Sequence, residues 1–209
     1  MIKIKDVSGN FRLFMRKIIL IALLLLPCLV WGSGGYDNGT ATGKGKFQLD
    51  LTWNPFDRFD FGQTYGVMSY GLTDRFDLHG YISRQKGPYH TWYGGIFYQF
   101  YKSKRIDLAS AVGIRKRFDE TWTHIFSPQL LYTGKITDKI SIGGSVVNVR
   151  NYESSENYGL TFDIAFAYKT SIQSEIIESI SIGIGGFHPA TWNPDSFFLP
   201  TYSVDIKFK

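Results

Sequence analysis

The chain has little cysteine. Its 209 residues contain one, Cys28, which lies in an apolar run near the N-terminus. We predict that this run is removed on export, so the mature chain has no disulfide and no thiol chemistry. Lipid attachment at Cys28 is the minor alternative, because Pro27 precedes it where a lipoprotein signal needs a small residue.

Long apolar runs are also lacking. The longest spans Ile18 to Val30, which is short of the roughly 20 residues of a membrane-spanning helix. Basic residues at 16–17 precede it and small residues at 32–34 follow it. This order predicts a signal peptide over residues 15–34, cleaved near Gly32 to Gly34. If translation starts at Met15, residues 1–14 are not part of the protein. If it starts at Met1, these residues extend the basic N-terminal region of the signal peptide.

Excess charge of one sign is absent once the leader is set aside. The formal net charge is +5, and residues 1–32 hold five basic residues against one acidic residue. The remainder is therefore nearly neutral, and we predict no nucleic-acid partner. The sequence also has no metal-ligand cluster, phosphate-binding loop or nucleotide motif, so we expect no metal and no cofactor.

What the chain does have is a repeated unit. The turn at 72–75 is followed by Phe76, Leu78 and other apolar residues that alternate with polar ones, which is the period of a strand with one apolar face. The same order of turn, basic, apolar and polar residues returns at 103–108 and 137–142, and more weakly from Ser174. A spacing of this size corresponds to one two-stranded hairpin with its loops.

The alternating segments predict ten strands. They lie at about 46–53, 63–72, 75–84, 91–101, 105–115, 124–134, 139–150, 158–168, 177–187 and 198–209. We predict an all-β fold, an antiparallel up-and-down transmembrane β-barrel over residues 46–209, with residues 35–45 as a flexible lead-in. Eight or twelve strands are the alternatives.

Two features favour a membrane barrel over a soluble periplasmic barrel or sandwich. Most of the expected strands match the roughly 9–11 residues that a tilted strand needs to cross a bilayer. Tryptophans gather at the connections after odd-numbered strands, as in an interfacial aromatic girdle. The girdle candidates are Trp53, Trp92, Trp122 and Trp192.

The last expected strand carries a family resemblance. Its alternating residues resemble the C-terminal signal of bacterial outer-membrane β-barrels, except that Lys209 follows the final aromatic residue. These residues are Tyr202, Val204, Ile206 and Phe208. Residues 69–78 are similar to a hairpin found in uncharacterised barrels of that class, including porins of the phenol-degradation type. The resemblance implies the bacterial outer membrane, with lipid, lipopolysaccharide and the barrel-assembly machinery as partners.

If the apolar faces meet lipid, the polar faces point inward. The candidate lumen-lining residues are Asp50, Asp77, His79, Asp107, Arg115, Asp163, Asp205 and Lys207. One hypothesis is a narrow channel for small polar or cationic solutes. The other is a non-conducting structural or recognition barrel filled by its own side chains.

An outer-membrane enzyme of the protease or lipid-modifying type is a weaker hypothesis, and we predict no catalytic residues. It would use rim histidines oriented by carboxylates. The residues concerned are His90, His124 and His188, with Asp57, Asp119, Glu120 and Asp195. A recurring Thr-Trp-Asn-Pro at 52–55 and 191–194 predicts two similar turns, or a paired rim feature that binds lipopolysaccharide or a partner.

Overall fold

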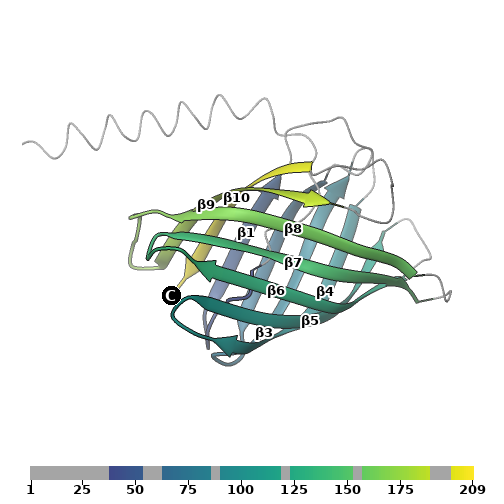
Figure 1. Ribbon diagram of the computed structural model, residues 1–209, viewed down its shortest axis with the longest axis horizontal. Coiled ribbons are helices and arrows are strands. Elements are labelled where there is room, and N and C mark those ends of the chain that lie inside the picture. Colours follow the sequence, from purple (N-terminus) through teal and green to yellow (C-terminus); the bar gives the residue numbers. More distant parts are fainter. Residues whose placement is uncertain (1–37, 54–62, 86–89, 119–122, 153–156, 189–198) are drawn as a thin grey trace, which may run out of the picture.

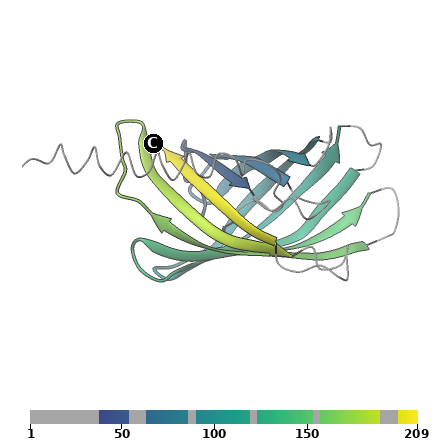
Figure 2. The same ribbon diagram turned by 90° about the horizontal axis from the view of Figure 1, so that it is seen from above.

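The computed structural model describes residues 38–53, 63–85, 90–118, 123–152, 157–188 and 199–209. They form ten strands in one closed barrel, inclined to the barrel axis (Figure 1 and Figure 2). The strands are β1 (Phe47–Trp53), β2 (Gln63–Gly71), β3 (Phe76–Gln85), β4 (His90–Lys102), β5 (Ile106–Arg117), β6 (Thr123–Lys135), β7 (Ile140–Asn151), β8 (Asn157–Lys169), β9 (Ile177–His188) and β10 (Leu199–Phe208).

Each strand pairs antiparallel with its neighbours in sequence, and β1 closes the barrel against β10. Closure leaves no strand edge with unpaired backbone groups, which a lipid environment requires. The predicted fold and the count of ten strands are confirmed, and the strand ends fall within two residues of the prediction. Among the described residues, no helix is long and apolar enough to span a membrane.

The barrel carries its apolar side chains on the outside. Ile182 and Ile184 of β9 are 50% and 55% exposed, and Leu78 of β3 is 48% exposed. Their inward neighbours are polar or small: Asp77 is 3% exposed and Ala109 is fully buried. Apolar residues outside and polar residues inside are the arrangement of a barrel that lies in lipid.

The four short turns share one hydrogen-bonding device. The hydroxyl oxygen of Thr73 accepts from the backbone N–H groups of Arg75 and Phe76, at 3.1 and 2.9 Å. Ser103 and Thr137 make the corresponding pairs of bonds, and Ser174 makes one. These turns and the C-terminus lie at one end of the barrel, which we call the short-turn end (Figure 1).

Replacing Thr137 by valine should lower the free energy of unfolding by about 1 kcal/mol, because two turn N–H groups lose their acceptor while side-chain volume is kept. Urea titration of the folded barrel in detergent micelles measures this change. Thr137→Ser retains the hydroxyl and serves as the control. Equal stability of the valine and serine variants would contradict the assigned role.

Residues 38–45, which we call the inner segment, lie inside the barrel as far as Gly43, and Lys44 and Gly45 are exposed. The sequence predicts a flexible lead-in here, but Gly39, Ala41 and Thr42 are buried among the strands. The polar inward face supplies hydrogen-bond acceptors for their backbone, which explains the difference. The predicted signal peptide at 15–34 lies outside the described residues.

Candidate functional site

The structure places the eight predicted lumen residues on the inward face of the barrel. In each strand they alternate with the exposed apolar side chains of the outward face. Buried among them are Asp50, Asp77, Asp107 and Arg115. The half-buried members are His79, Asp163, Asp205 and Lys207. They are spread over β1, β3, β5, β8 and β10. Among them, Lys207 lies close enough to Asp205 and Asp77 to interact with both carboxylates.

Two carboxylates face each other where the barrel closes. Asp50 of β1 pairs directly with Asp205 of β10, and the neighbouring inward pair is Gln48 with Lys207. Directly opposed residues on one face of a sheet have Cβ atoms about 5 Å apart. Asp50 also accepts a hydrogen bond from Thr52 Oγ1 at 2.5 Å. The closing seam therefore places two carboxylates on its inward face, beside one lysine.

Asp107 of β5 is tied into the wall by three donors. Its Oδ2 atom accepts from Thr40 Oγ1 of the inner segment at 2.8 Å, and Lys135 Nζ of β6 lies 2.8 Å from the same oxygen. Its Oδ1 atom accepts from the Ser103 backbone N–H at 3.3 Å. The charge of Asp107 is thus partly neutralised, and the residue holds the inner segment as well as lining the lumen.

Asp163 of β8 is held by its neighbour strand. The backbone N–H of Ser145 donates to Asp163 Oδ1 at 2.7 Å, and the Ser145 hydroxyl donates to Oδ2. Asp163 is half-buried. These bonds fix the direction of its carboxylate within the lumen.

An aromatic cluster occupies the lumen along β2, β3 and β4. Tyr93 stacks on Tyr81 with ring centroids 5.2 Å apart, and its hydroxyl lies 2.8 Å from both His79 Nε2 and Gln129 Nε2. Tyr65 packs edge-on against Tyr81 at 4.9 Å. The alternation in β4 is aromatic on both faces, so the sequence could not assign Tyr93 to the interior.

The inward side chains on the opposite wall are small. In the strand order β9 lies opposite β4, and it presents Ser181, Gly183 and Gly185 inward. The inward residues of β5 are also small, which suggests free space in the lumen beside that strand. A Cβ on Gly113 would overlap the Tyr93 ring, however, so the Tyr93 side chain fills this space.

Two of the predicted girdle tryptophans are described. Trp53 and Trp92 lie at the end opposite the short turns on outward positions, and Trp53 stacks on Tyr202 at 6.2 Å. Trp122 and Trp192 lie outside the described residues, as does the second Thr-Trp-Asn-Pro repeat. The sequence reading missed a second set of outward aromatics at the short-turn end. There the Phe76–Tyr98 and Phe47–Phe208 ring pairs lie 4.5 and 5.7 Å apart.

The four residues that resemble an assembly signal share the outward face of β10. Across the closing seam, Tyr202, Val204 and Ile206 pair with Trp53, Leu51 and Leu49. Phe208 packs its ring against Phe47. The same residues therefore close the barrel and extend its apolar exterior.

The rim histidines do not gather. His90, His124 and His188 come from β4, β6 and β9. His124 is paired with inward-facing Arg115, whereas His90 belongs to the outward face of β4. The carboxylates predicted near them lie outside the described residues. Within the described ranges, no three acidic or histidine side chains are grouped so that they could hold a metal ion.

The closed strand order, the apolar exterior and the polar interior together define a transmembrane β-barrel. No protein-family model matches the chain, and no curated protein matches it. Among solved structures it is similar to a KdgM porin, at 10% identity and a TM-score of 0.45, over 78% of this chain and 98% of that one.

Two further solved structures are similar. The KdgM porin in complex with disordered oligogalacturonate matches at 9% identity and a TM-score of 0.46, over 78% of this chain and 98% of that one. The solution structure of the de novo designed TMB2.3 matches at 14% identity and a TM-score of 0.37, over 80% and 95%. The resemblance to phenol-degradation-type porins stays a prediction.

Proposed function

We propose that this protein is an outer-membrane β-barrel that forms a narrow channel for small polar or cationic solutes. The observation that carries the proposal is the opposed pair Asp50 and Asp205 on the inward face of the closing seam. Like charges directly opposite one another on one face of a sheet destabilise the pairing of its strands. The placement of two carboxylates there, beside the single lysine Lys207, therefore favours a role in attracting cations over a purely structural one.

The position of Asp163 also favours selectivity for cations. Asp163 lies on β8, where the inward neighbours Ala165 and Ala167 are small, and it accepts two hydrogen bonds from Ser145. A carboxylate beside a narrow polar path raises the local concentration of cations. Arg115 lies on the far wall, on β5, next to the aromatic cluster.

The second candidate function is a non-conducting structural or recognition barrel. The aromatic cluster around Tyr93 and the buried inner segment favour it, because both fill space that a channel would use. An enzyme has less support, since the described histidines are spread over β4, β6 and β9. Lipopolysaccharide and the barrel-assembly machinery are the partners proposed for the exterior and for β10.

The channel is tested by refolding the chain from about Ser33 in detergent and recording single-channel currents in a planar bilayer. We expect a cation-selective reversal potential in a salt gradient. In the double variant Asp50→Asn with Asp205→Asn, the preference for cations should fall a few-fold, because unit charges about 6 Å apart in water interact by roughly 0.7 kcal/mol.

The matched control removes two acidic charges outside the lumen. Asp138 and Glu175 lie exposed in short turns, so Asp138→Asn with Glu175→Gln should keep the selectivity of the unmodified barrel. An equal loss in both double variants would assign the selectivity to surface charge. A folded barrel with no current would favour the structural candidate.

A further inference from the structure

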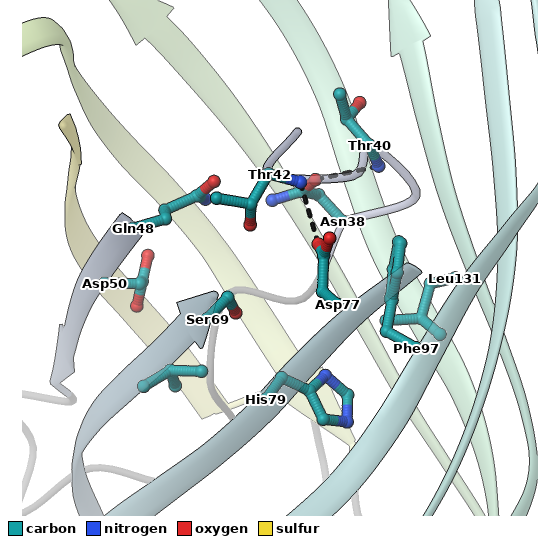
Figure 3. A pocket seen from close by; sticks show the side chains of 11 residues that line it. Asn38, Thr40, Thr42, Gln48, Asp50, Ser69, Asp77, His79, Phe97 and Leu131 are labelled. Atoms are coloured by element: carbon teal, nitrogen blue, oxygen red, sulfur yellow. Dashed lines mark hydrogen bonds between the residues drawn. The ribbon is translucent and has the colours of Figure 1, made fainter. Parts of the chain in front are cut away.

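The inner segment crosses the lumen at the short-turn end and meets one strand with each residue. The backbone N–H of Thr42 donates to Asp77 Oδ2 on β3 at 2.7 Å (Figure 3). The backbone N–H of Ala41 donates to Gln99 Oε1 on β4 at 3.3 Å. Thr40 Oγ1 donates to Asp107 on β5 at 2.8 Å, and the Gly39 N–H donates to Thr133 Oγ1 on β6 at 2.9 Å. Four successive residues on four successive strands place the segment across the wall, at a steep angle to the strands.

A tight reversal joins the inner segment to β1. Gly43 and Gly45 adopt φ angles of +91° and +74°, which side chains other than glycine rarely allow. The Gly45 N–H donates to the carbonyl oxygen of Gly71 at 2.8 Å, and the Gly71 N–H donates to the carbonyl oxygen of Lys46 at 3.0 Å. The backbone of Lys44 also lies within 3.4 Å of Asp74 Oδ1 in the first short turn. The segment is thus held to the barrel wall at its exit as well as along its length.

The fit against the wall leaves no room for a side chain at two positions. A Cβ on Gly39 would lie 2.6 Å from the carbonyl oxygen of Asp107 and 2.8 Å from the Cα atom of Tyr132. A Cβ on Gly71 would overlap the carbonyl oxygen of Gly43. Ala41 belongs to the buried apolar cluster of Phe97, Ala109, Ala111 and Leu131.

The space that the segment leaves beside it is small and polar. A cavity of about 40 Å³ is lined by Thr40 and Thr42 of the segment and by Ser69, Asp77 and His79 of the wall (Figure 3). A volume of this size holds a few water molecules. The segment therefore leaves room for little more than water at this point beside β3.

We propose that the inner segment is a plug built into the chain, which narrows the lumen at the short-turn end and whose release widens it. The plug is suited to release because its side chains are small and it is bound through side-chain acceptors instead of a continuous strand ladder. Its release would also free the carboxylates of Asp77 and Asp107 to face passing solutes. The role of the plug in transport rests on the proposed channel.

The test displaces the plug by a single substitution and follows access to the cavity. Ser69→Cys places a thiol on the cavity wall, in a chain from Ser33 that has no other cysteine. The rate of its reaction with a small, charged methanethiosulfonate reagent is measured by mass spectrometry in micelles. Adding Gly71→Val, which drives Gly43 away, should raise this rate on the order of tenfold or more, since a protected site reacts only when it opens.

The matched control lies on the same strand. A Cβ on Gly66 meets only Leu51 Cδ2, at 3.9 Å, so Gly66→Val should leave the labelling rate unchanged. Gly39→Val is a second way to displace the plug, from its other end, and serves if Gly71→Val fails to fold. The proposal would be overturned if both folded plug variants were labelled as slowly as the parent. It would also be overturned if the parent were labelled as fast as the two plug variants.

Single-channel currents from the same variants separate the plug from the channel. Larger currents in both plug variants than in the parent, together with faster labelling, would support both proposals. Faster labelling without current would keep the plug and reject the channel. Equal currents and equal labelling in the parent and both variants would keep the channel and reject the plug.

Discussion

Arginine in place of Ile182 should lower the free energy of unfolding by about 2–4 kcal/mol, because a charged side chain near the bilayer midplane must leave water. Ile182 lies in the middle of β9, faces outward and is 50% exposed. The loss is measured by urea-dependent unfolding of the barrel in lipid vesicles, followed by tryptophan fluorescence.

The control for Ile182 uses the same substitution at the edge of the apolar exterior. Ile176 precedes β9 in the last short turn and is 68% exposed, more than Ile182. Ile176→Arg should therefore cost only about 0–1 kcal/mol, as lipid-face charges near the interface do. In a soluble barrel both changes would be surface substitutions of similar, small effect. Equal small costs would thus contradict the membrane assignment.

The fold could be predicted because its signals are local. Alternation of apolar and polar residues marks each strand, and the hydroxyl of Thr73, Ser103 or Thr137 marks each tight turn within a few residues. An open sheet in lipid would leave unpaired backbone groups at its edges, so the first strand must pair with the last. Each of these steps uses contacts between residues close in the sequence or neighbouring strands.

The plug could not be predicted because its contacts are distant and its composition is uninformative. Gly39 meets Thr133, 94 residues away, and Thr42 meets Asp77, 35 residues away. A segment rich in glycine and threonine before the first strand has no apolar–polar periodicity, so its sequence predicts a flexible lead-in. Asp77 and Asp107 were predicted to face the lumen, but their bonds to this segment depend on how the barrel curves around it.

A change at Tyr93 best distinguishes a filled lumen from a conducting one. Its side chain is 6% exposed, stacks on Tyr81 and covers Gly95 and Gly113. Tyr93→Ala should lower the free energy of unfolding by about 3–5 kcal/mol, as loss of a large buried aromatic side chain does, and leave a cavity in the middle of the barrel. In a bilayer the same variant should conduct more than the parent, because this ring narrows the path between β4 and β9.

Two controls divide the effect of Tyr93 into its parts. Tyr93→Phe keeps the ring and removes the hydroxyl that lies 2.8 Å from His79 and Gln129, so it should cost only about 1–3 kcal/mol and leave the conductance unchanged. Tyr98→Ala makes the same truncation on the outward face of β4, where it should lower stability without altering the current. If Tyr93→Ala and Tyr98→Ala had the same conductance as the parent, the ring would not limit flow. The plug, or a filled and non-conducting core, would then be the barrier.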